Sequence, residues 1–350
     1  MLLEYLKKIC TLLVILLVTG RILQDPGMFS DAVRDGLMTC TEHMIPSLFA
    51  LMAISEILVR SGLYQLIGIP FRGVARHIFH MTDAESAVFL ISQFAGYPVG
   101  LSMLSSAVKS GAICKARARR MSLFCFGAGP AFTVSLIGIG IYGEPVAGWL
   151  IYGANVGMNL LLAIVLRSPV SEETKQSGCA LPFSEALITG TRKASVNLFQ
   201  ICALMLMMKV LLTAAMPVLP RGEVRVLIAA FTEISQVISF PRYQTLLIPL
   251  IASLTAFGGI CVLFQLRSLG GDCLHIQSFL AARLFAAIGS FLICHVLTPI
   301  VLHDYTTPVV SGSFHAARSE HPMLSVVLVM MSAMLVLEWK RIERKKALCK

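Results

Sequence analysis

Four charged residues stand inside long apolar runs of this sequence, where a bare charge is costly. They are Glu56, Lys209, Glu233 and Arg283. An ionisable side chain at the centre of a hydrocarbon layer costs about 2.5–3.5 kcal/mol on insertion scales, so it usually pairs, lines a wet cavity or serves an ion. Glu56 and Glu233 have the chemistry to bind a cation or a proton, and Arg283 could pair with a carboxylate such as Glu233. We therefore predict that Glu56, Glu233 and Arg283 take part in ion coupling.

Each charge also has a plainer interpretation. Glu56 lies near the end of its run and could face lipid headgroups together with Arg60. Arg283 could contact headgroups too, and Lys209 could extend along the apolar surface until its ammonium reaches water. Glu233 differs because other polar side chains surround it and would line a cavity with it, namely Thr232, Ser235 and Gln236.

Glycine and proline interrupt two of the apolar runs. The first, 87–108, contains Gly96-Tyr97-Pro98-Val99-Gly100, and the second, 243–266, contains Phe257-Gly258-Gly259. Proline removes a helix donor and glycine weakens the helix, so we expect half-helices or re-entrant hairpins. Two half-helix ends can direct their dipoles at a bound group. The predicted substrate-binding residues are Gln93, Gly96, Tyr97, Pro98, Gly100, Glu233, Gln236, Gly258, Gly259 and Gln265.

The same residues have structural alternatives. Glycines let membrane helices approach closely, which is the expected role of Gly127 and Gly129. Gln93 and Gln265 could equally satisfy backbone groups freed by the breaks. Asn155 and Asn159 lie one turn apart and are expected to hydrogen-bond between helices.

Composition sets the environment of these runs. Of 350 residues, 56% are hydrophobic and 14% are charged, whereas a soluble domain has about 25% charged residues. Spanning segments must be helices or closed barrels, and the unbroken apolar runs favour helices. The sequence thus predicts an all-α polytopic protein of the bacterial inner or plasma membrane. The net charge of +10 follows the positive-inside pattern, so the lipid bilayer rather than nucleic acid is the expected partner.

Order and hydropathy indicate two related halves. We predict an N-terminal transmembrane helix and amphipathic linker (1–40), a first repeat (41–166), a cytoplasmic linker (167–193), a second repeat (194–339) and a basic tail (340–350). Inverted repeats with broken helices commonly place a site near the bilayer midplane. The apolar segments expected are 9–23, 44–59, 63–79, 87–108, 121–142, 145–166, 194–218, 226–240, 243–266, 276–302 and 323–337.

Several of these motifs resemble one family. They are Met44-Ile45-Pro46-Ser47-Leu48-Phe49, Gly96-Tyr97-Pro98-Val99-Gly100, the glycine–proline segment 126–132, and Phe257-Gly258-Gly259 with Gln265. The sequence resembles sporulation integral membrane proteins carrying a nucleoside-recognition, or gate, domain, which concentrative nucleoside transporters and ferrous iron permeases share. The resemblance covers about residues 40–300. It implies two inverted gate-type repeats and a permease for a nucleoside or another small polar solute.

The sequence departs from that family in two places. Phe126 and Gly127 stand where the family usually has asparagines, and Glu233-Ile234-Ser235-Gln236 replaces a Glu-x-Thr-x-Gly segment. These differences favour the alternative of a non-transporting scaffold for spore cortex or envelope assembly. No nucleophile–base set or P-loop is present in the sequence, so we expect no enzyme and no cofactor. No metal site is predicted, because the histidines at 303, 315 and 321 are irregularly spaced. A homo-oligomer is compatible with the pattern.

Overall fold

A computed structural model describes residues 2–168, 180–220, 222–240, 244–270 and 273–302 of the chain. Within these ranges the protein is built of helices and contains no strand. Four helical segments are long and apolar enough to cross a membrane, and up to six if each of two sharply bent pairs counts as one span. The predicted all-α polytopic membrane architecture is confirmed.

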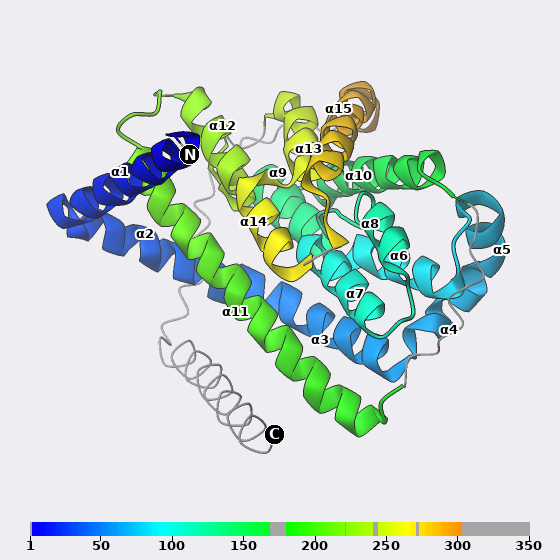
Figure 1. The fold of residues 1–350 in the computed structure, drawn as a ribbon. Coiled ribbons are helices and arrows are strands. Elements are labelled where there is room, and N and C mark those ends of the chain that lie inside the picture. The colour runs from blue at the N-terminus through cyan, green and yellow to red at the C-terminus, as the bar shows by residue number, and fades with distance from the viewer. Residues whose placement is uncertain (1, 169–179, 221, 241–243, 271–272, 303–350) are drawn as a thin grey trace, which may run out of the picture.

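The N-terminal arm leads into a long rod. Helix α1 (Leu2–Gln24) meets α2 (Pro26–Thr39) at a bend of 102°. Asp25 accepts a hydrogen bond from the Met28 amide at 3.1 Å and caps α2. One π-helical turn, Cys40–Met44, then joins α2 to α3 (Ile45–Ser61), and Figure 1 shows α2 and α3 as nearly one continuous rod.

The amphipathic segment after α3 runs across that rod. Gly62 has a φ of 73°, a left-handed conformation that ends α3. Short helical pieces follow at a bend of 100°, and their outer face exposes apolar side chains such as Leu66 and Phe71. The pieces are α4 (Tyr64–Gly68), a 3₁₀ turn (Ile69–Phe71), α5 (Arg72–Val74) and a π-helical turn (Ala75–Phe79).

The first glycine–proline break forms a hairpin. Helices α6 (Asp83–Ala95) and α7 (Tyr97–Lys109) have 13 residues each, or about 20 Å, which is shorter than the ~30 Å hydrocarbon core. Gly96 separates them with a φ of 89°. A Cβ on Gly100 would lie 2.7 Å from the Ser92 Cβ, so α7 folds back against α6. Neither helix can cross the bilayer alone.

The predicted span at 121–142 is wrong in its first part. Helix α8 (Lys115–Met121) ends there, and residues 122–129 form turns and then irregular backbone, the non-helical segment. Only 131–142 is helical, as a π-helix (Ala131–Ile139) followed by α9 (Gly140–Tyr142). Gly127, Gly129 and Pro130 explain the missing turns, because they lower helix stability in one short stretch.

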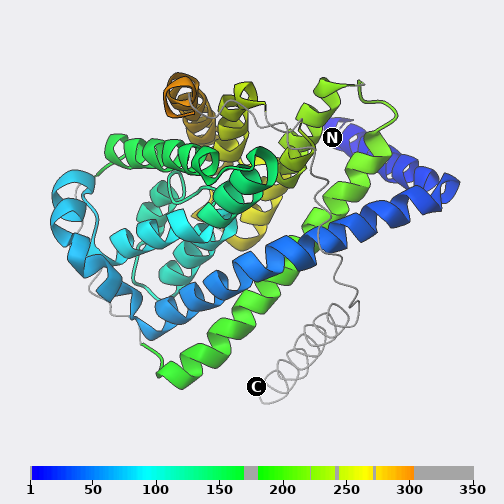
Figure 2. The same cartoon turned by 180° about the vertical axis from the view of Figure 1, so that it is seen from behind.

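Helix α10 (Pro145–Val165) closes the first half, and α11 (Phe183–Ala215) opens the second. Helix α11 begins inside the predicted linker 167–193, so the last eleven residues of that range are helical. With 33 residues, α11 is about 50 Å long and exceeds the hydrocarbon thickness. It packs along α3, and both views show the two helices crossing (Figures 1 and 2).

The second half contains two breaks. Helix α12 (Glu223–Thr232) ends at Glu233, and a 3₁₀ helix (Ile234–Ser239) follows, so the predicted segment 226–240 is interrupted in its middle. A 3₁₀ turn (Thr245–Leu247) then leads into α13 (Ile248–Phe257), α14 (Gly259–Gly270) and α15 (Ile276–Val301).

The second glycine break differs from the first. Gly258 and Gly259 have φ values of 93° and 81°, yet Thr245–Gly270 forms a 26-residue segment long enough to cross. Helix α3 packs on α11 and α7 packs on α14, so elements before and after the central linker meet. The inverted repeat itself stays a prediction. The predicted segment 323–337 and the basic tail 340–350 lie outside the described residues.

Replacing Gly100 with alanine should destabilise the hairpin. The added methyl group would meet the Cys125 carbonyl oxygen and the Ser92 Cβ, and overpacking of this kind costs about 1–3 kcal/mol. Thermal unfolding in detergent should show a lower Tm for Gly100→Ala. Gly153→Ala is the matched control: Gly153 lies within α10 and has open space around it, so its Tm should hold or rise. Equal effects at the two positions would contradict a tight hairpin.

Candidate functional site

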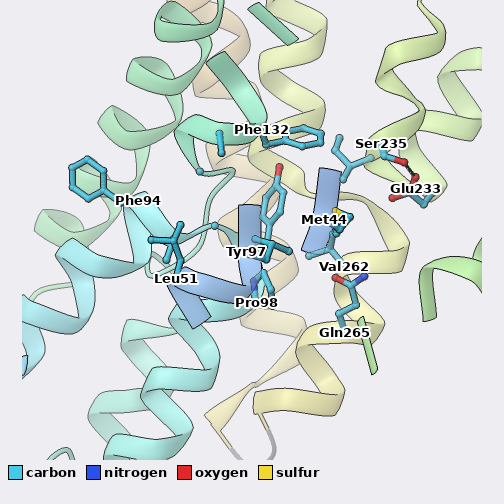
Figure 3. Close-up of a pocket in the computed structure, with 16 residues that line it drawn as sticks. Met44, Leu51, Phe94, Tyr97, Pro98, Phe132, Glu233, Ser235, Val262 and Gln265 are labelled. Atoms are coloured by element: carbon cyan, nitrogen blue, oxygen red, sulfur yellow. Dashed lines mark hydrogen bonds between the residues drawn. The ribbon is translucent and has the colours of Figure 1, made fainter. Parts of the chain in front are cut away.

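A small cavity lies where the broken helices meet. Its volume is about 60 Å³, and its lining comes from α3, the α6–α7 hairpin, residues 129–132, the Glu233 break and α14 (Figure 3). One water needs about 10–15 Å³ by this kind of measure. In this conformation the cavity holds a few waters or a solute of that size, and a nucleoside is too large for it.

The first turn of α7 forms one wall of the cavity. Gly96, Tyr97 and Pro98 all line it, so the positive end of the α7 dipole faces the enclosed space. The Tyr97 hydroxyl donates to the Thr255 carbonyl of α13 at 2.7 Å, and the Tyr97 ring contacts the Phe126 ring at 4.9 Å between centroids. A Cβ on Gly258 would lie 3.5 Å from the Tyr97 ring. The Tyr97 ring thus brings the first glycine break close to the second.

Glu233 supplies the negative group of the cavity. Its side chain is 3% exposed and accepts a short hydrogen bond from the Ser235 hydroxyl. Figure 3 shows Glu233 and Ser235 on one side of the cavity, with Gln265 below them on α14. Gln265 is buried, and its amide nitrogen donates to the Cys261 sulfur at 3.5 Å. The carboxylate is therefore shielded from lipid and lies beside a polar neighbour.

The structure brings five predicted site residues together and leaves the others elsewhere. Gly96, Tyr97, Pro98, Glu233 and Gln265 line the cavity. The rest do not line it and have separate positions, namely Gln93, Gly100, Gln236, Gly258, Gly259, Glu56 and Arg283. Their absence from the lining has physical causes: close packing for the glycines, and other hydrogen-bond partners for most of the polar residues.

Arg283 donates hydrogen bonds to the non-helical segment 122–129 and does not pair with Glu233. It is 1% exposed, and its guanidinium donates to the Leu123 carbonyl, to the Phe126 carbonyl at 3.5 Å and to the Asn159 side chain at 3.2 Å. Its charge also lies over the Phe126 and Phe279 rings at 4.9 and 5.6 Å, a cation–π arrangement. The predicted Arg283–Glu233 pair is wrong.

Two side-chain amides bond the same stretch of backbone as Arg283. Gln93 donates to the Phe124 carbonyl at 3.3 Å, and Asn159 donates to the Phe126 carbonyl at 2.6 Å and to the Gln93 oxygen at 2.9 Å. We call Gln93, Asn159 and Arg283 the backbone clamp. Non-helical backbone is tolerated at membrane depth only where protein satisfies its polar groups. These three side chains donate to carbonyls of the non-helical segment.

Glu56 belongs to a second buried polar cluster. It is 1% exposed, and the hydroxyls of Ser102 and Ser106 donate to its carboxylate at 2.7 and 3.1 Å. Arg60 lies 3.6 Å away, and Asn197 of α11 donates to Ser102 at 3.0 Å. Glu56 therefore ties α3 to α7 and α11 instead of facing headgroups, although Arg60 is its neighbour as the alternative interpretation expected.

Arg117 of the basic helix α8 bonds to the start of α6. Arg117 makes two hydrogen bonds of 2.6 Å to the Glu85 carboxylate and one of 2.7 Å to the His80 carbonyl. Glu85 also accepts from the Thr82 amide at 2.8 Å, and Thr82 caps α6 in return. This capping box fixes where the hairpin begins.

Two further observations bound what the site can hold. In the part of the chain that the structure describes, no group of three His, Cys, Asp or Glu side chains could hold a metal ion. A larger hollow of about 330 Å³ shares Leu51, Phe94 and Ala95 with the cavity, and its lining is apolar except for Ser55. Such a lining suits lipid chains better than a polar solute.

Comparison with known proteins gives one relative. The chain is 25% identical over 166 residues to the sporulation integral membrane protein YlbJ of Bacillus subtilis (strain 168), a match that covers 47% of this chain. The match spans 41% of that relative's length. No family model matches the chain, and no solved structure matches it.

The chain is a multi-pass membrane protein. That conclusion follows from its apolar helices together with an integral membrane relative, and it places the protein in the bacterial cell membrane. Polar groups that lie within the hydrocarbon layer then have to be satisfied without bulk water.

Sequence reasoning did not predict the non-helical segment 122–129 or the backbone carbonyls that accept hydrogen bonds there. The carbonyls of Leu123, Phe124 and Phe126 decide where Gln93 and Arg283 point, and carbonyls carry no sequence signal. The Gly127-Ala128-Gly129-Pro130 run was the available clue, because it predicts non-helical backbone that needs donors. Ser235 was noted beside Glu233, but its direct hydrogen bond was not predicted.

Replacing Arg283 with methionine should destabilise the fold. Methionine keeps most of the volume but leaves the Leu123 carbonyl without its arginine donor and the Phe126 carbonyl with Asn159 as its donor, and an unsatisfied buried group costs about 1–3 kcal/mol. Removing a buried charge opposes this loss. We expect the lost hydrogen bonds to dominate and Tm to fall. Arg267→Met, at an exposed position of α14, should leave Tm nearly unchanged. A Tm for Arg283→Met at or above that of the parent would refute the clamp.

Proposed function

We propose that the chain is a transporter-like permease that moves a small polar solute through the cavity between its broken helices. The observation that supports this most is the joint lining by a helix N-terminus, a buried carboxylate and a buried amide, contributed by Gly96–Pro98, Glu233 and Gln265. Gate-type transport of this kind uses broken helices around a central site.

The size of the cavity favours a solute smaller than a nucleoside. About 60 Å³ corresponds to a few waters, so a nucleoside would require the α6–α7 hairpin to move away from Phe132 or Glu233. Glu233 in this arrangement would carry the coupling cation or proton, because its only direct side-chain partner among the described residues is the neutral Ser235 hydroxyl. Recognition of a nucleoside, which the family resemblance implies, is part of this proposal only if the hairpin moves in that way.

The alternative function is a non-transporting scaffold in spore envelope or cortex assembly. The relative is a sporulation protein by its name, and we extend that link to sporulation to this chain as part of the proposal. One observation favours a scaffold: Gln93 and Arg283 are committed to holding backbone, and the Tyr97 hydroxyl is bonded to Thr255. These polar groups would then serve rigidity and not solute binding.

Uptake into proteoliposomes tests the permease. The solutes are nucleosides, nucleobases, amino acids and monovalent cations, each with and without an imposed proton or sodium gradient. Glu233→Gln keeps the shape and removes the charge, so gradient-driven uptake should fall at least about tenfold while Tm stays close to that of the parent, a barrier change of about 1.4 kcal/mol or more.

The control for that substitution lies at the other end of the same helix. Glu223 is exposed at the start of α12, so Glu223→Gln should transport like the parent. If the parent takes up no solute under any gradient, the permease is refuted. If Glu233→Gln also supports normal spore formation in a Bacillus subtilis strain lacking the relative, while parent uptake is absent, the scaffold function is supported instead.

A further inference from the structure

Sulfur-bearing side chains gather behind the cavity, where α2–α3, α11 and α14 meet. They are Cys40, Met44, Cys202, Met205, Met208 and Cys261, which pack together with Leu211. The sequence has 10 cysteines and 17 methionines among 350 residues. Composition alone does not lead one to expect a packed group in which nearly every member carries sulfur. We call these six residues the sulfur cluster.

Local structure aims these side chains at one another. Cys202, Met205 and Met208 repeat every three residues on α11 and so share one face. Cys40 and Met44 occupy the single π-helical turn that joins α2 to α3, and such turns occur often at functional sites. Cys40 and Cys202 pack in this one cluster, and neither forms a disulfide.

The cluster adjoins the cavity. Met44 lines the cavity and also packs in the cluster. Gln265 lines the cavity and donates to the Cys261 sulfur at 3.5 Å. Glu233 lines the same cavity, and the Lys209 side chain packs beside Gly36, one helical turn before Cys40. The cluster therefore lies next to polar residues of the cavity from which an ion could enter.

We propose that the sulfur cluster is a binding site for a soft monovalent cation of the Cu(I) class, held by the Cys40 and Cys202 sulfurs with a methionine thioether, which we assign to Met205, the most deeply buried methionine of the cluster. Thiolate and thioether ligands select Cu(I) over harder ions. Zinc is a poor fit because it takes four N, S or O ligands, and the described residues hold no group of three His, Cys, Asp or Glu suited to a metal.

Charge balance is consistent with this ion. Binding of Cu(I) releases two thiol protons to water and leaves two thiolates around one positive charge, a net charge of −1. The Lys209 ammonium would offset that charge, and Glu233 would attract the free cation toward the cavity. No oxidation or reduction is involved in binding. The site does not depend on transport of the solute proposed above, since binding is measured on the protein itself.

Anaerobic titration of the purified full chain in detergent tests the site. The probe is Cu(I) in competition with a Cu(I) chelator of known affinity. All samples carry Ser at Cys10, Cys114, Cys179 and Cys349, so that these other thiols cannot bind the probe. We expect one tightly bound Cu(I) per chain with a sulfur-only first shell in X-ray absorption spectra.

The variants separate ligands from bystanders. Cys40→Ser and Cys202→Ser should each weaken binding by at least about 100-fold, since loss of a mere second-shell partner already costs about 10–100-fold in affinity. Met205→Leu preserves volume and should weaken binding by a smaller factor without loss of fold. Cys125→Ser and Cys294→Ser are controls, because both cysteines are buried away from the cluster. They should bind like the parent.

Three results would overturn the proposal. The first is stoichiometric Cu(I) binding that Cys40→Ser and Cys202→Ser leave intact. The second is an equal loss of affinity in the Cys125→Ser and Cys294→Ser controls, which would indicate nonspecific thiol binding. The third is a Cys40–Cys202 disulfide, detected by mass spectrometry in protein isolated without reductant, together with no Cu(I) binding after reduction.

Discussion

The fold depends on satisfying a non-helical stretch of backbone in a place without water. Residues 122–129 form turns and then irregular backbone between α8 and the helical segment 131–142, and the carbonyls of Leu123, Phe124 and Phe126 accept hydrogen bonds from side chains. Hydrocarbon offers no replacement partner, and each unpaired group costs several kcal/mol there. The guanidinium of Arg283, the amide of Asn159 and the amide of Gln93 fill that need. This requirement explains why a buried arginine with no carboxylate partner among the described residues is tolerated in α15.

The clamp also determines the shape of the cavity. The non-helical segment 122–129 passes close to the α6–α7 hairpin. A Cβ on Gly129 would lie 2.7 Å from the Phe94 carbonyl oxygen. That contact holds the end of α6 and thereby sets the direction in which α7 begins. The Tyr97 hydroxyl then reaches α13, and Asn155 of α10 donates to Thr255 at 2.9 Å beside it. The cavity is therefore bounded on one side by rigid, hydrogen-bonded parts and on the other by the helix break at Glu233.

Sequence reasoning predicted the parts of the fold that depend on hydropathy and on glycine or proline. Composition identified the environment, and Gly96 and Gly258 marked the two breaks that come together around Tyr97. It failed where long-range geometry decides. The break at Glu233 has no glycine or proline beside it, and the assignment of Arg283 to carbonyls 157 residues away is not encoded in any local pattern. Five of the predicted site residues line the cavity, whereas the glutamine before the first break and the arginine of α15 instead support the backbone.

Arg283 has a consequence for how the chain is made. Its acceptor at Phe126 precedes it by 157 residues, and a ribosome adds about 5–20 residues per second. Roughly 8–30 seconds of synthesis therefore separate the synthesis of the non-helical segment from that of Arg283, its donor. During that interval the first half has carbonyls with no arginine to bond, so it must wait partly inserted, hydrated or covered by the insertion machinery. A chain that stops at the central linker would keep the donors Gln93 and Asn159 but would leave the Leu123 carbonyl without Arg283, so the second half completes what the first half begins.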